Sequence, residues 1–164
     1  ARLQEEEARR KALEDAMNGE YDTDYDALID AATGSDIGKQ MAKFGCQYIG
    51  NKYVYGGNSL TDGIDCSGFT FMVYALNGIY IHRDSAWLPQ SPIRKIADCE
   101  KKPGDLLYFP GHIALYLGNG EYIHSTAKDG AGVTINSMKK GCAGYRADLE
   151  KSYLYAGTVF LDDC

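Results

Sequence analysis

The order of two apolar periodicities constrains the fold more than any other feature of this chain. Apolar residues first recur at helical spacing, at Ile37, Met41, Phe44 and Tyr48 and again over residues 66–77. An irregular, proline-containing stretch at 79–103 separates them from strand-like runs at 105–109, 112–117, 121–125, 133–136 and 153–160. Helices followed by a meander of strands are typical of an α+β domain. We therefore expect a helix packed on an antiparallel sheet of about five strands.

The acidic charge of the chain belongs to its N-terminal part. Of the 23 acidic and 17 basic residues, 11 and 4 respectively lie within residues 1–36. Residues 1–17 read as a charged helix with a thin apolar stripe, and residues 18–34 as a solvated linker. We therefore expect residues 1–34 to be a helical linker or appendage, extending from a coiled coil or an upstream domain. The main domain is expected at 35–164, starting at the N-cap candidate Ser35.

Several classes of partner are disfavoured by the composition. No basic patch is interleaved with aromatic residues, which argues against nucleic acid. No apolar run approaches the ~20 residues of a transmembrane helix. Asp22, Asp24 and Asp26 alternate as in a calcium loop, but the glycine and closing glutamate of that loop are missing. The cysteines form no CxxC pair, so we expect neither a metal nor a cofactor.

The run Asp65-Cys66-Ser67-Gly68 joins a glycine-rich turn at 53–57 to the helical run that begins at Cys66. A helix N-terminus carries free N–H groups and partial positive charge, which stabilise a thiolate. Cys66 is therefore the candidate nucleophile, with a thiol pKa expected below the ordinary value. The alternatives are a buried structural cysteine at position 66 and a simple N-cap at Asp65.

Two histidines follow in strand-like runs. In the run 112–117, His112 lies on the face opposite the aliphatic row. A three-residue loop at 118–120 would set His124 opposite Ala114, on the same face as His112 and within side-chain reach. A two-residue loop would place the two histidines on opposite faces, and the sequence does not force either register.

The other four cysteines leave two interpretations open. Cys46, Cys99, Cys142 and Cys164 are an even number, which permits two disulfides in an oxidising compartment. The alternative is that most of them are reduced and act as small, buried apolar residues.

Five blocks in one order carry a family resemblance. They are Tyr53-x-Tyr55-Gly56-Gly57, Asp65-Cys66-Ser67-Gly68-Phe69, Pro103-Gly104-Asp105-Leu106, His112-Ile113-Ala114-Leu115-Tyr116-Leu117-Gly118 and Ile123-His124. Over about residues 37–161 the chain resembles the NlpC-type cysteine peptidases, which are papain-like bacterial cell-wall endopeptidases. Tyr55 replaces the commoner tryptophan and Ala114 a glycine, which affects the shape of the groove rather than a catalytic group.

The resemblance implies a role for each matching residue. Cys66 would attack the substrate, His112 would be its base, and His124 would orient that base. Tyr53 would support the oxyanion. Residues expected to line the substrate groove are Asp65, Ser67, Tyr55, Arg83 and Ser85, with Asp65 a candidate partner for a free substrate amine.

The implied activity is cleavage of peptidoglycan stem peptides at the bond following γ-D-glutamate, by an extracellular or wall-associated enzyme. A thiol amidase or transpeptidase on the same substrate is the alternative within enzymes. A non-catalytic wall-binding module is the alternative outside them.

Overall fold

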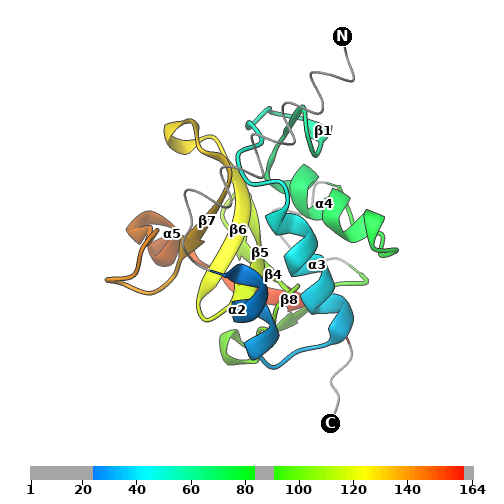
Figure 1. The fold of residues 1–164 in the computed structure, drawn as a ribbon, viewed down its shortest axis with the longest axis vertical. Helices are drawn as coiled ribbons and strands as arrows, with labels where there is room; N and C mark the ends of the chain where they lie inside the picture. The colour runs from blue at the N-terminus through cyan, green and yellow to red at the C-terminus, as the bar shows by residue number, and fades with distance from the viewer. Residues whose placement is uncertain (1–23, 84–90, 161–164) are drawn as a thin grey trace.

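The computed structural model describes residues 24–83 and 91–160 (Figure 1). The helices are α2 (Tyr25–Ala31), α3 (Asp36–Cys46), α4 (Cys66–Leu76) and α5 (Ala147–Ser152). The strands are β1 (Asn58–Ser59), β2 (Gly63–Ile64), β3 (Arg94–Ile96), β4 (Leu106–Phe109), β5 (His112–Gly118), β6 (Glu121–Thr126), β7 (Gly132–Ser137) and β8 (Tyr155–Thr158).

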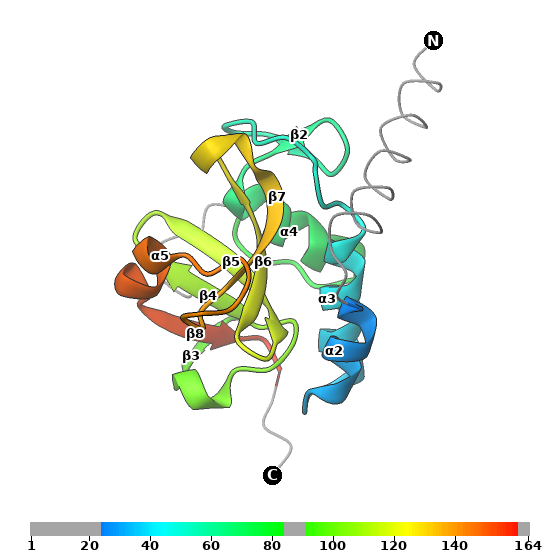
Figure 2. The same ribbon diagram turned by 60° about the vertical axis from the view of Figure 1, so that its left-hand side comes forward.

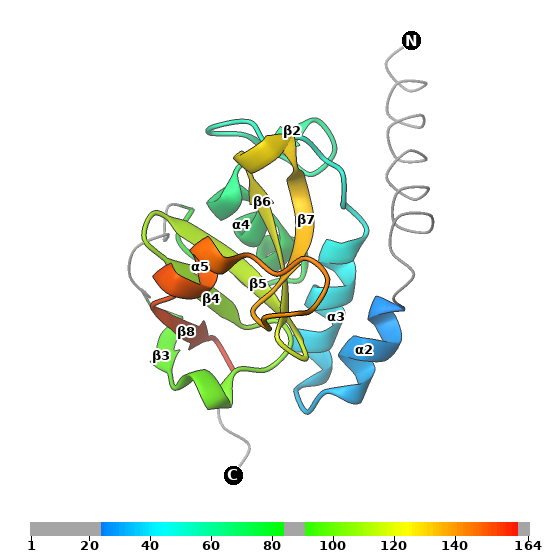
Figure 3. The same cartoon turned by 90° about the vertical axis from the view of Figure 1, so that its left-hand side faces the viewer.

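The larger sheet has the order β3-β8-β4-β5-β6-β7, and every neighbouring pair in it is antiparallel. Strands β1 and β2 pair separately. Helices α2, α3 and α4 lie on one side of the large sheet (Figure 2), and α5 lies against its other face (Figure 3). The expected α+β order, with α4 packed on an antiparallel sheet, is confirmed.

Strand β5 is buried on both faces because the sheet lies between two layers. Ile113, Leu115 and Leu117 belong to the core shared with the helices. Ala114 and Tyr116 belong to a second cluster with Leu149 of α5. The alternation expected for this strand is therefore confirmed, and β5 forms the centre of the molecule.

Strand β3 and helix α5 were not expected from the sequence. Strand β3 falls in the stretch read as irregular, and it makes the sheet six-stranded rather than about five-stranded. Its Arg94 and Lys95 are exposed and only Ile96 is buried, so the segment has no apolar alternation that would predict a strand. It is a strand because its backbone pairs with β8.

The solvated linker predicted at 18–34 is wrong over α2. Asp24 caps this helix, and Tyr25 and Ile29 are buried in the core that contains α3 and β5. Residues 1–23 lie outside the described residues, and the domain boundary at residue 35 stays a prediction. The expected N-cap at Ser35 is confirmed, because its hydroxyl accepts a hydrogen bond from the Gly38 N–H.

Two buried tyrosines offer a matched test of the core. The Tyr74 hydroxyl donates to the Gly104 carbonyl, whereas the buried Tyr122 hydroxyl has no hydrogen-bond partner among the described residues. We expect Tyr74→Phe to lower the free energy of unfolding by about 1–3 kcal/mol, since it strands a buried carbonyl. Tyr122→Phe should be neutral or slightly stabilising. Urea unfolding measures both changes, and equal costs would show that the hydrogen bond to Gly104 adds nothing to stability.

Candidate active site

Helix α4 starts at Cys66 because Asp65 caps it. Asp65 Oδ1 accepts a hydrogen bond from the Gly68 N–H at 2.7 Å, and the backbone of Asp65 is extended. A Cβ on Gly68 would lie 2.4 Å from the Gly57 carbonyl oxygen, so glycine lets the glycine-rich turn approach this end of the helix. The motif therefore fixes both the first residue of α4 and the loop beside it.

The Cys66 thiol lies at the junction of α4 and β5. Burial is the largest influence on it and raises its pKa, and the Asp65 carboxylate also raises it. The backbone N–H of Ile113, next to His112 in β5, acts in the opposite direction, as do the N–H groups of Ser67 and Cys66. The expectation of a lowered thiol pKa is therefore wrong in direction, because burial outweighs the helix N-terminus.

The β5–β6 hairpin has the register that places both histidines on one face, but its turn differs from the one expected. Gly118 pairs with Glu121 across a two-residue turn in which Asn119 and Gly120 both have positive φ. A β-bulge between Tyr116 and Gly118 then adds one residue to β5 and restores the pairing of Leu115 with Ile123. The expected three-residue loop is replaced by a turn and a bulge, while the two histidines still share one face.

The two histidine rings are in contact. His112 Nε2 lies 2.7 Å from His124 Nδ1, and His124 Nε2 lies 2.7 Å from Asn136 Oδ1. The Phe109 ring packs on His112 and the Tyr122 ring on His124, with centroids 5.7 and 5.0 Å apart. Since Nε2 of His112 is occupied by His124, Nδ1 is the nitrogen left to take a proton from a thiol.

Burial keeps both rings neutral. It lowers the pKa of His112 to about 4, with a smaller lowering from Arg146 that Asp148 opposes. Burial and, to a lesser extent, the neighbouring His112 lower the pKa of the fully buried His124 to about 3, although the hydrogen bond to Asn136 acts in the opposite direction. At neutral pH the site therefore holds a neutral imidazole, which is the form that can act as a base.

Three of the residues expected to bind substrate, Asp65, Ser67 and Arg83, are in contact with one another. Arg83 donates to the Ser67 hydroxyl at 2.6 Å and to the Gly57 carbonyl at 3.0 Å, and it forms an ion pair with Asp65 at 3.0 Å. Tyr55 is 90% exposed on the adjoining turn and contributes to no such cluster. Ser85 lies outside the described residues.

Tyr53 lies near Cys66. Burial raises the pKa of its phenol, and negative charge on Cys66 and Asp65 raises it further. A bridge to Ile64, two residues before Cys66, holds the backbone of Tyr53 next to the segment that leads into α4.

Asn136 is a site residue that was not expected from the sequence. It lies opposite Tyr122 in the β6–β7 pairing, which makes it a diagonal neighbour of His124 on the same face. The register of β6 against β7 would have revealed it. The Asp129-Gly130 pair marks a turn between these strands, but the connection at 127–131 contains a 3₁₀ turn at Lys128–Gly130 and is too long for that pair to fix the register.

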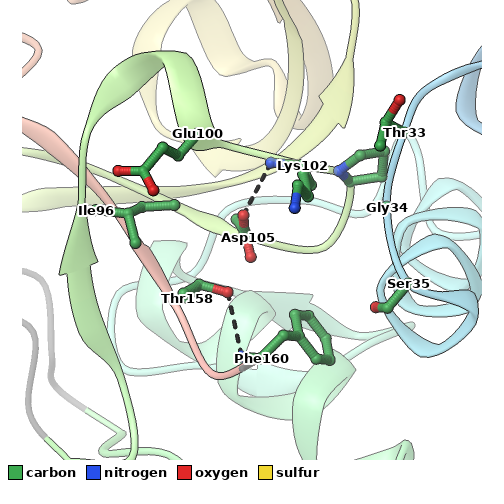
Figure 4. A pocket seen from close by; sticks show the side chains of 10 residues that line it. Thr33, Gly34, Ser35, Ile96, Glu100, Lys102, Asp105, Thr158 and Phe160 are labelled. Carbon is green, nitrogen blue, oxygen red and sulfur yellow. Dashed lines mark hydrogen bonds between the residues drawn. The ribbon is translucent and has the colours of Figure 1, made fainter. Parts of the chain in front are cut away.

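A pocket of about 160 Å³ lies apart from these residues (Figure 4). Asp105 lines it and accepts a hydrogen bond from the Lys102 N–H at 2.8 Å, while its Oδ1 has no hydrogen-bond partner in the described part of the chain. Burial raises the pKa of this carboxyl to about 6, although the Thr158 hydroxyl and the Lys102 N–H favour its charged form. Asp105 of the Pro-Gly-Asp block therefore stabilises the turn that leads into β4, through its hydrogen bond with the Lys102 N–H, and does not contact the histidine pair.

The sequence matches the family model described as the NlpC/P60 family over residues 50–149, which include Cys66, His112 and His124. This chain belongs to that family. Dipeptidyl-peptidase 6 of Lysinibacillus sphaericus is 42% identical over 113 residues, which are 69% of this chain and 41% of that protein. The γ-D-glutamyl-L-lysine dipeptidyl-peptidase of Bacillus cereus is 40% identical over 90 residues, covering 49% and 26%. The chain spans less than half the length of the curated relatives it matches.

Solved structures of this family share the fold. The NlpC/p60 domain of the peptidoglycan hydrolase SagA superposes with a TM-score of 0.57 at 32% identity, covering 74% of this chain and 97% of that domain. An NlpC/P60 family protein from Bacillus cereus gives 0.57 at 28% identity, covering 73% and 39%. The papain-like fold predicted for the NlpC/P60 domain is confirmed.

The remaining sequence expectations concern cysteines, metals and membranes. Cys46, Cys66, Cys99 and Cys142 are all unpaired, and Cys164 lies outside the described residues. Within residues 24–83 and 91–160, no cluster of three or more His, Cys, Asp or Glu side chains could hold a metal. In the same part of the chain, no helix is long and apolar enough to cross a bilayer.

The buried His124 makes the fold sensitive to acid. Its pKa is about 6.5 in the unfolded chain and about 3 in the folded one, so below pH 6.5 protons bind the unfolded state first. Stability is therefore present above pH 6.5 and is lost as the pH falls toward the folded value. We expect the wild-type free energy of unfolding to fall by on the order of 1–2 kcal/mol more than that of His124→Gln between pH 7 and pH 5.

Urea unfolding at the two pH values measures this difference. Asp105, with its raised pKa, works the other way: its contribution favours folding at low pH and is lost as the pH rises through about 6. It is common to both proteins and cancels in the comparison. Equal losses in the wild type and in His124→Gln would show that His124 titrates normally in the folded state.

Proposed function

We propose that this NlpC/P60 domain is a thiol endopeptidase that cleaves peptidoglycan stem peptides at the bond following γ-D-glutamate. The observation that carries the proposal is the contact between His112 and His124, at the strand end that meets the start of the Cys66 helix. A wall-binding module without catalysis would not require two neutral imidazoles in contact at the strand that meets the start of the Cys66 helix.

The chemistry follows from the groups present. The S–H bond of Cys66 breaks as its proton moves to Nδ1 of His112, and the sulfur forms a bond to the γ-carbonyl carbon of D-glutamate. The resulting oxyanion is stabilised by the N–H groups at the start of α4, with Tyr53 in support. His112 then gives the proton to the leaving amine, the C–N bond breaks, and a thioester remains.

Hydrolysis of the thioester repeats the sequence with water. His112 takes a proton from the water, and the water oxygen bonds to the acyl carbon. The C–S bond then breaks, and His112 returns the proton to the sulfur, which regenerates the thiol. Because burial raises the pKa of Cys66 and lowers that of His112, the resting pair is a neutral thiol and a neutral imidazole. Proton transfer then accompanies attack instead of preceding it.

The Asp65 carboxylate supports cleavage within intact chains more than recognition of a free amine. Its two oxygens already accept the Gly68 and Gly56 N–H groups, and Arg83 balances its charge at 3.0 Å. The names of the relatives in Lysinibacillus and Bacillus cereus favour the alternative, a dipeptidyl-peptidase that needs a free N-terminus. An extracellular or wall-associated location follows from the substrate in either case.

A matched pair of substrates separates these two activities. We expect L-Ala-γ-D-Glu-diamino-acid peptides to be cut after γ-D-Glu with rates within about threefold whether the alanine is free or N-acetylated, since Asp65 already has a cation. Mass spectrometry identifies the bond cut, and Cys66→Ser should release no fragment. Slowing of more than about tenfold by acetylation would establish the dipeptidyl-peptidase instead. Cleavage at another bond, including one to the sugar, would refute the proposed specificity.

A further inference from the structure

The orientation of the Asn136 amide is fixed by its surroundings. Its Nδ2 lies 2.8 Å from the Gly144 carbonyl oxygen, which also accepts the Ser137 N–H at 3.0 Å. A carbonyl oxygen can only accept, so the NH₂ group of Asn136 must face Gly144. The Oδ1 atom therefore faces His124, where it too can only accept.

That orientation determines where the protons lie on both histidines. Nε2 of His124 must donate to Asn136 Oδ1, so in the neutral ring Nδ1 has only its lone pair. Nε2 of His112 must then donate to Nδ1 of His124, at 2.7 Å. Because a neutral ring carries one proton, the lone pair of His112 is left on Nδ1, the nitrogen that the proposed mechanism needs as the base.

We propose that Asn136 is a positioning residue that fixes the tautomer of both histidines and so presents the basic Nδ1 of His112 to Cys66. The catalytic meaning of this inference rests on the proposed function, whereas the tautomers themselves do not. When His112 accepts the Cys66 proton, its Nε2–H stays bonded to His124, so one proton moves and the rest of the chain of hydrogen bonds is unchanged.

The loop after β7 supplies the last acceptor of this chain of hydrogen bonds, the carbonyl of Gly144. Gly144 has a φ of +76°, and a Cβ there would meet the Ile135 carbonyl oxygen at 3.2 Å. Glycine therefore allows the loop after β7 to aim its carbonyl at Asn136. An isolated parallel β-bridge between Ser137 and Tyr145 holds the loop beside β7.

The charged side chains near the rings are engaged elsewhere. The Arg146 guanidinium is engaged by Asp148 at 2.6 Å, and Lys128 pairs with the same carboxylate at 3.4 Å. The Tyr122 hydroxyl has no hydrogen-bond partner among the described residues, and its ring only packs on His124. Asn136 is therefore the group that decides the tautomer of His124.

Nitrogen-15 NMR of the histidine rings in the full chain tests the inference without any substrate. In the wild type at pH 7 we expect both rings to be protonated on Nε2 and unprotonated on Nδ1. Asn136→Ala should mix the tautomers and lower kcat by about 10- to 100-fold, the scale known for residues that orient metal-bound histidines, with KM nearly unchanged. Asn136→Asp keeps an acceptor for His124, so it should keep the tautomers and recover part of the loss.

Asn77→Ala is the matched control. Asn77 also donates its amide to a backbone carbonyl, that of Val73 at 2.7 Å, but at the far end of α4. It should lose stability without any change in the histidine spectra or kcat. A wild-type His112 protonated on Nδ1, or unchanged tautomers and kcat in Asn136→Ala, would overturn the inference. Should Asn136→Ala fail to fold, the wild-type and Asn136→Asp spectra still decide it. Absence of peptide cleavage by the wild type would refute the proposed function but leave the tautomer result standing.

Discussion

The site depends on the register of one hairpin. Strand side chains alternate between faces, so a shift of β6 by one residue against β5 would send His124 to the opposite side of the sheet from His112. The two-residue turn at Asn119-Gly120 would produce that shift by itself. The bulge between Tyr116 and Gly118 cancels it, and the ring contact of 2.7 Å follows. The contact of Asn136 with His124 depends in turn on the β6–β7 register.

Burial and not charge sets the chemical state of this site. A sheet covered on both faces leaves His124 fully buried, and desolvation favours the neutral ring. The same effect outweighs the helix N-terminus at Cys66. The cations nearby are already paired, Arg83 with Asp65 and Arg146 with Asp148. Such an environment stabilises a neutral thiol and a neutral imidazole, which is the state from which the proposed attack coupled to proton transfer begins.

Local signals in the sequence predicted most of this arrangement. The helix from Cys66 and the alternation of β5 each depend on residues within a few positions of one another, and both are confirmed. The cap at Asp65, which the sequence left open beside a substrate-binding role, is also present. The blocks around Cys66, His112 and His124 also identified the family before the fold was known.

What could not be predicted depends on tertiary pairing. Strand β3 exists because β8 offers it an edge, and α2 is helical and buried because a core lies beneath Tyr25 and Ile29. Asn136 reaches His124 only through the β6–β7 register, which the turn signal at Asp129-Gly130 does not fix because the connection at 127–131 is longer than a two-residue turn. The direction of the Cys66 pKa likewise required the depth of burial, which no spacing of residues reveals.

The covalent intermediate on Cys66 is the central claim, and trapping it is the most direct test. Rapid acid quenching of a single turnover on an L-Ala-γ-D-Glu-diamino-acid peptide, followed by mass spectrometry of the digested protein, locates any acyl group. We expect a thioester of the γ-D-glutamyl fragment on the peptide that contains Cys66, absent from Cys66→Ser. Turnover with no adduct on that peptide, or an adduct on a different residue, would contradict the claim.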